Sequence, residues 1–187
     1  MKFFRTGRKG VVSHAVVLVC LLMSIDARQV SAANMRSFIE AVRRKATVVY
    51  VGSVKDVQML TRTKFDIKAR ALVDVLAVAR GAGNRREATL EYSSFDDKTP
   101  MLEGGPQYQL RPGLKVVVFA NSFASSIPPG YLLQGSREEL LQRVAALRDS
   151  LNKMSADQLR VNEINEEDRR IQLELYEKLS AYLHASK

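Results

Sequence analysis

Residues 65–79 read FDIKARALVDVLAVA, and this stretch decides the fold. From Phe65 to Val75, apolar side chains alternate with mostly charged ones, a pattern that predicts a long strand with one buried face. The second half, LVDVLAVA, is apolar on both faces. We therefore expect the strand to be half-exposed at its start and covered on both sides toward its end.

Further strands are predicted on both sides of this one. Residues 47–60, TVVYVGSVKDVQML, are rich in β-branched side chains, and Gly52 among them predicts a bend or a bulge. We also expect strands at EATLEYSS, YQL, KVVVFAN and YLLQG, which begin at residues 87, 108, 115 and 131, and a loop at residues 122–130. No helical pattern separates these strands, so they predict an antiparallel sheet closed, or nearly closed, into a small barrel. Its inner face is expected to include Val49, Ile67, Val73, Leu90 and Val117.

Helical spacing flanks the barrel. Residues 35–45, MRSFIEAVRRK, predict a short amphipathic helix, and the basic cluster in its last turn complements the helix dipole, with a ligand site as the alternative. After the strands, Ser136 and Glu139 have the spacing of a capping box, and a last helix is expected after Asn165. We expect the first of these helices to pack on the barrel. The last should stay at least partly exposed, where it offers a surface for a partner or for self-association.

The first 32 residues are typical of a secretory signal peptide. Residues 2–9 are basic, residues 11–25 are an apolar run too short for a transmembrane helix, and small residues follow. Cleavage is expected after Ala32 or Ala33, and the alternative is an uncleaved membrane anchor. The chain thus divides into a signal peptide (1–32), a barrel domain (33–135) and a C-terminal helical extension (136–187), and the fold class is mainly β with α.

Composition indicates a globular protein, and the net positive charge is unevenly distributed along the chain. The 187 residues include 46% hydrophobic and 26% charged side chains, which is globular composition rather than that of a disordered chain. The net charge is +9, and after residue 32 it falls to +5, with 24 basic and 19 acidic residues. Residues 33–135 have a net charge of +6 and residues 136–187 of −1, so the basic character belongs to the barrel.

Few residues are suited to catalysis or to metal binding. After residue 32 the chain has no cysteine, and its one histidine is His184 near the C-terminus. A Ser-His-Asp or Cys-His arrangement needs a well-placed histidine, and a zinc site needs three or four ligands, so one histidine near the C-terminus suffices for neither. Asp96, Asp97 and Glu103 could chelate calcium, although a solvated loop is the favoured interpretation. We expect no catalytic residue, no metal ion and no cofactor.

The β part resembles the netrin-like modules, which include the tissue inhibitors of metalloproteinases and exported bacterial relatives. The residues that carry this resemblance are Val49, Val51, Gly52, Val54, Gly81, Gly113, Val117, Val118 and Phe119. The resemblance implies a five-stranded OB-like barrel with flanking helices. The inhibitors chelate zinc through an amino-terminal cysteine, and because residues 33–187 contain none, that mechanism is absent here.

One cluster could serve as a binding site for a ligand or partner. OB-like barrels bind through loops and one sheet face, often with aromatic side chains beside basic ones. Three arginines lie in one predicted loop near a barrel end, and Phe95 and two tyrosines could supply the aromatic rings. For these aromatic residues, packing in the core or at the barrel rim is the favoured interpretation, and ligand binding is the alternative. The candidate site residues are Arg80, Arg85, Arg86, Tyr92 and Tyr108.

These observations favour an exported, non-enzymatic OB-like module that binds another protein of the cell envelope or the extracellular space. The first alternative is a nucleic-acid- or polyanion-binding OB protein, which the signal peptide argues against. The second is a hydrolase that uses carboxylates. Contact with a membrane is expected only if the signal segment is retained.

Overall fold

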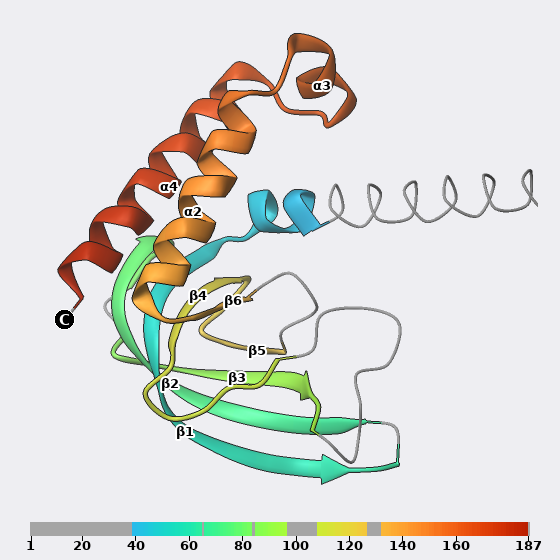
Figure 1. Ribbon diagram of the computed structural model, residues 1–187, viewed down its shortest axis with the longest axis vertical. Coiled ribbons are helices and arrows are strands. Elements are labelled where there is room, and N and C mark those ends of the chain that lie inside the picture. Colours follow the sequence, from blue (N-terminus) through green and yellow to red (C-terminus); the bar gives the residue numbers. More distant parts are fainter. Residues whose placement is uncertain (1–38, 65, 84, 97–107, 127–131, 187) are drawn as a thin grey trace, which may run out of the picture. The chain divides into compact units, whose positions relative to one another are not determined.

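A strongly curved sheet of six strands carries the fold (Figure 1). In this computed structural model the described residues are 39–64, 66–83, 85–96, 108–126 and 132–186, and they belong to one compact unit that begins at Ile39. The strands are β1 (Val48–Arg62), β2 (Ile67–Arg80), β3 (Glu87–Ser94), β4 (Lys115–Ala120), β5 (Ala124–Ser126) and β6 (Leu132–Gly135). The expected signal peptide and its cleavage positions lie outside the described residues, as do Phe65, Asp97 and Glu103.

The strand order is β5-β3-β2-β1-β4-β6. All neighbours pair antiparallel except β3 and β5, which are parallel. This arrangement confirms the expected class, mainly β with α and an OB-like barrel. Two local expectations were wrong: β5 lies within the expected loop at 122–130, and residues 108–110 form no strand. The backbone N–H of Tyr108 nevertheless donates to the carbonyl of Ser93 at 3.0 Å, which ties this segment to the end of β3.

The alternation at the start of β2 is confirmed. Ile67, Ala69, Ala71 and Val73 are buried, and the lysine and arginine between them are exposed. The β1–β2 register shifts at Gly52, where a bulge was expected. A Cβ at position 52 would collide with the Val73 side chain, so only glycine allows the two strands to approach this closely.

The concave face of the sheet encloses the first of two hydrophobic cores. Tyr50, Val73 and Leu90 are fully buried there, and the Tyr50 ring stacks on Phe123 with 5.5 Å between the ring centroids. The buried members of this core are Val48, Tyr50, Val54, Ala69, Ala71, Val73, Ala88, Leu90, Tyr92, Tyr108, Leu110, Val116, Val118, Ala120 and Leu132.

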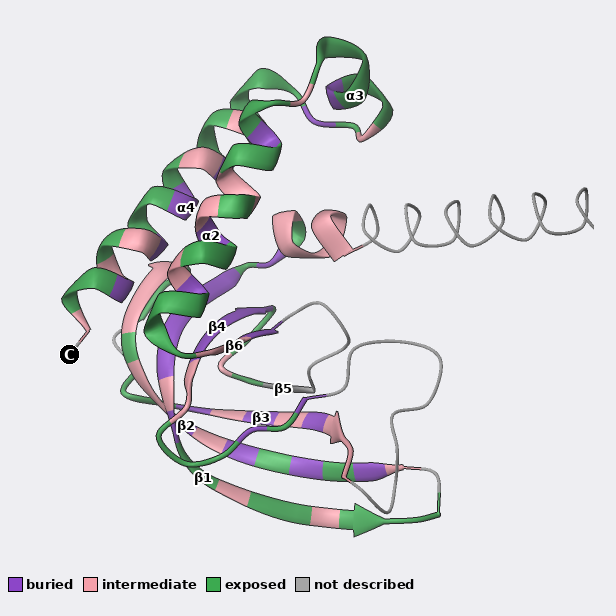
Figure 2. Cartoon of the chain, viewed as in Figure 1, coloured by how far each residue is buried: buried purple, intermediate pink, exposed green. Residues whose placement is uncertain are grey.

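The second core lies between the other face of the sheet and the helices. Val49 and Val117 belong to it, so their assignment to the inner face of the barrel was wrong. The first residues of β1 and nearly all of β4 are buried one after another (Figure 2). Because both faces of these segments are apolar, the sequence has no alternation of polar and apolar residues that would show which face a residue is on. The buried members of the second core are Ala46, Val49, Val51, Val117, Phe119, Leu133, Leu140, Val144, Leu151, Leu159, Ile164, Leu175, Tyr176, Leu179 and Leu183.

Three helices follow the sheet, and the N-caps of the first and the last are those that the sequence predicts. They are α2 (Arg137–Asn152), α3 (Ala156–Val161) and α4 (Glu166–Ala185). Ser136 and Glu139 form the expected capping box of α2, Ser155 forms another at α3, and Asn165 caps α4. Helix α2 packs on α4, β4 and β6, and α4 also packs on β1 and β2. No helix in the described part of the chain is long and apolar enough to cross a membrane.

Helix α4 is buried on one side and exposed on the other. Leu179 and Leu183 are fully buried, whereas Ile171, an apolar residue of the same helix, is 41% exposed. The exposed side carries ion pairs along the helix, including Arg170 with Glu167 at 2.6 Å. The partial exposure expected for this helix is therefore that of its charged side, while its apolar side belongs to the second core.

Candidate functional site

A groove of about 640 Å³ opens at one end of the barrel. It lies where β3 and β6 end, beside the segment that leads into β4 and the first turns of α2. We call it the barrel-end groove, and its lining residues are Ser94, Phe95, Gln109, Leu110, Arg111, Leu114, Gln134, Gly135, Glu139 and Arg143. Pockets that bind ligands commonly have volumes of about 300–1,000 Å³, so the groove is large enough for a small molecule or a short peptide segment.

One wall of the groove is held in place by Gly135 and the start of α2. The Glu139 carboxylate accepts a hydrogen bond from the backbone N–H of Ser136 at 2.7 Å, which completes the capping box. Gly135 has a φ of +156°, and a Cβ there would lie 2.6 Å from Oε2 of Glu139. Glycine at this position therefore lets the strand turn directly into the helix. It also leaves room for the Glu139 carboxylate at the N-terminus of α2.

The described lining of the groove carries a net positive charge. Arg111 and Arg143 are both exposed, and neither forms an ion pair within 4.0 Å among the described residues. The capping box already engages Glu139. Two guanidinium groups and one carboxylate give the described lining a net charge of about +1, which favours anionic ligands.

Polar and apolar groups alternate along the remaining lining. Gln109 donates from Nε2 to the carbonyl of Phe95 at 3.2 Å, so it joins the two strand-connecting segments on either side of the groove. The Oε1 atom of Gln134 is buried and has no hydrogen-bond partner in the structure. Phe95 and Leu114 are partly exposed and supply apolar surface. Because Gln134 lines a groove open to solvent, this oxygen can accept a hydrogen bond from a ligand or from water.

Tyr92 and Tyr108, both candidate binding-site residues, form a pair inside the barrel next to the groove. Their rings meet edge to face with 6.4 Å between centroids, and they are 3% and 5% exposed. Burial raises the pKa of Tyr92 to about 12, and a hydrogen bond with the backbone of Leu110 opposes this rise. The structure thus confirms the favoured interpretation of these two residues, core packing, in which the two rings support the groove from within.

Arg80 has a structural environment. It is the last residue of β2, and its Nη1 donates to the carbonyls of Arg44 and Ala46 at 3.0 and 3.2 Å. Its Nη2 donates to Oε1 of Gln172 on α4 at 3.3 Å, and burial lowers its pKa. Arg80 thereby caps the helical segment at residues 39–45, whose last carbonyls would otherwise lack partners.

The basic cluster of the 39–45 segment also makes structural contacts. The guanidinium of Arg43 lies 5.6 Å from the centroid of the Phe119 ring, a cation–π distance. Arg44 donates from Nη2 to the carbonyl of Asn162, the C-cap of α3, at 3.0 Å. The alternative of a ligand site at this cluster gains no support from these contacts.

Arg85 and Arg86 are exposed in the connection between β2 and β3. The Arg86 carbonyl accepts from the backbone N–H of Val75 at 2.8 Å. Five residues of β3 separate Arg86 from Tyr92, which at about 3.3 Å per strand residue puts them near opposite ends of that strand. The structure does not bring the predicted arginines and tyrosines together into one site.

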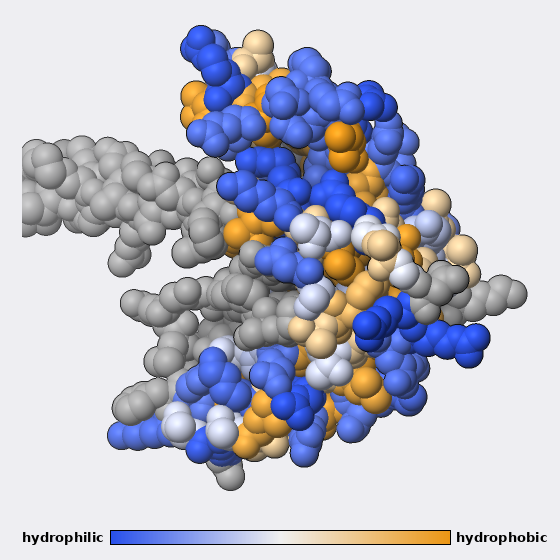
Figure 3. All heavy atoms as spheres, turned by 180° about the vertical axis from the view of Figure 1, so that it is seen from behind, coloured by the Kyte–Doolittle hydropathy of each residue, from blue (hydrophilic) through white to orange (hydrophobic). Residues whose placement is uncertain are grey.

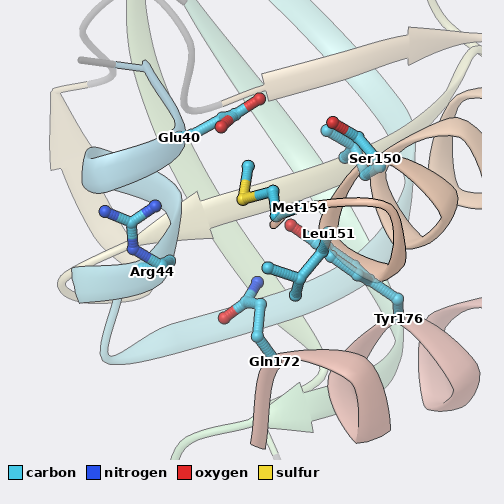
Figure 4. A pocket seen from close by; sticks show the side chains of 8 residues that line it. Glu40, Arg44, Ser150, Leu151, Met154, Gln172 and Tyr176 are labelled. Atoms are coloured by element: carbon cyan, nitrogen blue, oxygen red, sulfur yellow. The ribbon is translucent and has the colours of Figure 1, made fainter. Parts of the chain in front are cut away.

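A second cavity lies between the 39–45 segment, α2 and α4 (Figure 4). Gln172, which is 2% exposed, points into it with an unpartnered Nε2, and Arg44 and Tyr176 are among the other lining residues. Its volume of about 20 Å³ has room for one water molecule, which needs about 10–15 Å³. The cavity is too small for any larger ligand.

The described residues offer no catalytic arrangement that stands out from structural ion pairs. Within those ranges no three histidine, cysteine or acidic side chains come together as a metal site. Asp96, which could have been a calcium ligand although a solvated loop was the favoured interpretation, pairs with Arg62. Sequence reasoning missed Arg111 and Arg143, because they lie far apart in the chain and only the pairing of β4 with β6 brings them to one groove.

Comparison of the chain with models of known protein families and with curated proteins finds no match.

Proposed function

We propose that this chain is an exported, non-enzymatic OB-like binding module of the cell envelope or the extracellular space, and that it holds another protein in the barrel-end groove. The observation that carries the proposal is the groove itself, about 640 Å³ in volume and lined by four separate parts of the described chain. Its arginines have no ion-pair partner among the described residues, and an apolar ring lies beside them, as in many protein-binding sites.

The nucleic-acid alternative is less well supported by the same surface. Proteins that bind single strands without sequence preference combine a basic groove with exposed aromatic rings on which bases stack. Tyr92 and Tyr108 are buried, so Phe95 is the one aromatic ring among the residues that line the groove. A single partly exposed ring offers little stacking surface.

Site-specific photocrosslinking tests whether the groove binds a protein. A photoreactive phenylalanine analogue replaces Gln109, an exposed lining residue, and the chain is irradiated in the cells that make it. We expect one discrete adduct with another protein, found by a mass shift on a denaturing gel and identified by peptide mass spectrometry. The same analogue at Lys178, on the exposed side of α4, is the control. Equal adducts at both positions, or none at position 109, would contradict the proposal.

Export is the second testable part of the proposal. The basic, apolar and small-residue regions of residues 1–33 support removal of a signal peptide. The chain recovered outside the cytoplasm is expected to begin at Ala33 or Asn34, which mass spectrometry of its amino-terminal peptide measures. Recovery of the chain with Met1 intact in the membrane fraction would mean that the segment is retained as an anchor.

A further inference from the structure

We infer that the barrel-end groove recognises an acidic segment of its protein partner, whose carboxylates are held by Arg111 and Arg143. This inference rests on the proposed function and names the chemistry of the ligand. It commits to carboxylates on a polypeptide rather than to phosphates on a nucleic acid or to a membrane surface.

The first argument is the balance of charge in the groove. Two guanidinium groups line it, and its single carboxylate, Glu139, is engaged by the backbone of Ser136. Several cations elsewhere on the described surface are paired with a carboxylate. Arg70 pairs with Glu91 at 2.6 Å, and Lys55 pairs with Glu87 at the same distance. Among the described residues, Arg111 and Arg143 form no such ion pair, so their N–H donors can bind the carboxylates of a ligand.

The second argument is the kind of cation. A guanidinium presents a planar set of N–H donors that matches a carboxylate in a bidentate contact, and it is more weakly hydrated than an ammonium group. The two arginines reach the groove from different elements, the turn before β4 and the second turn of α2. Carboxylates on successive or alternate residues of one segment can therefore be held at two points.

The third argument is the apolar surface between the charges. Phe95 and Leu114 line the groove and are only partly buried. By contrast, the large exposed apolar side chains of the described surface, Met59, Leu76, Val161 and Ile171, come from four different elements. The face in Figure 3 likewise shows hydrophilic side chains predominating, with apolar ones in separate patches. A segment that combines carboxylates with an apolar residue fits the groove better than it fits the rest of the surface.

Fluorescence anisotropy with a labelled ten-residue peptide of alternating glutamate and leucine tests this inference on the purified chain. We expect saturable binding that weakens as salt is raised, because charge attraction contributes to it. Arg111→Glu and Arg143→Glu should each weaken binding at least tenfold, and the milder Arg111→Gln should weaken it less. Arg85→Glu is the matched control, since Arg85 is exposed and lies outside the groove. Circular dichroism melts verify that each variant is folded.

Two further probes separate the possible outcomes. The first is the same peptide with glutamine in place of glutamate, and the second is a ten-nucleotide oligothymidylate. Equal binding of the neutral peptide would overturn the inference and leave the proposed function standing. Tighter binding of the oligonucleotide, lost in the Arg111→Glu variant, would overturn both. Failure of the acidic peptide to bind would overturn the inference alone, because the crosslink at position 109 decides the proposed function separately.

Discussion

Deletion of residues 166–187, which removes α4, is expected to abolish cooperative thermal unfolding of the chain. The helix contributes Leu175, Tyr176, Leu179 and Leu183 to the second core. Burial of a large apolar side chain stabilises a fold by about 1.5–3 kcal/mol, so four of them contribute on the order of 6–12 kcal/mol. A domain of this size is stable by only about 5–15 kcal/mol in total. A circular dichroism melt of the truncated chain should therefore show no sharp transition.

Point variants on α4 separate the loss of packing from the loss of chain length. Leu179→Ala should lower the free energy of unfolding by about 2–5 kcal/mol, because Leu179 is fully buried. Lys178→Ala, one residue earlier and exposed, should change it by less than about 0.5 kcal/mol. A truncated chain that still melts cooperatively would show that the sheet and α2 suffice for folding. The apolar side of α4 would then be free for a partner or a second copy.

The sequence predicts the elements whose causes are local. Ser136 with Glu139 and Asn165 before an acidic turn identify helix starts, since a cap depends only on residues a few positions apart. Gly52 marks a bulge for the same reason. The sequence also predicts which face of β2 is buried. The other face is exposed at the start of the strand, so charged residues alternate with apolar ones there.

The sequence does not predict features that depend on residues distant in the chain. Strand β5, with the sequence Ala-Ser-Ser, has no strong strand pattern and forms through parallel pairing with β3. Arg80 is assigned to a loop by its glycine-rich surroundings, yet its guanidinium caps a helical segment that precedes β1. Arg111 and Arg143 look like ordinary surface residues until the fold places both at one groove.

Val117→Asp is expected to leave the chain unfolded. Val117 is fully buried in the second core, where it lies on β4 opposite Val51 of β1. The substitution removes about 1.5–3 kcal/mol of apolar burial. It also places a carboxylate, without a cationic partner on the strand facing it, in a site that water does not reach, which costs several kcal/mol more. The two losses together approach the whole stability of a typical domain, about 5–15 kcal/mol.

Lys68→Ser is the matched control for this substitution, because it also replaces a side chain within a central strand of the sheet. Lys68 points to solvent, donates to Ser93 at 2.7 Å and pairs with Asp66 at 3.2 Å. An exposed pair of this kind is worth about 0–1 kcal/mol, so the variant should melt within a few degrees of the parent chain. If Lys68→Ser proved more damaging than Val117→Asp in a circular dichroism melt, the register of the sheet would be wrong by one residue. A shift of one position exchanges the buried and exposed faces of a strand, and Lys68 would then face the first core, where the structure places Ala69 and Ala71.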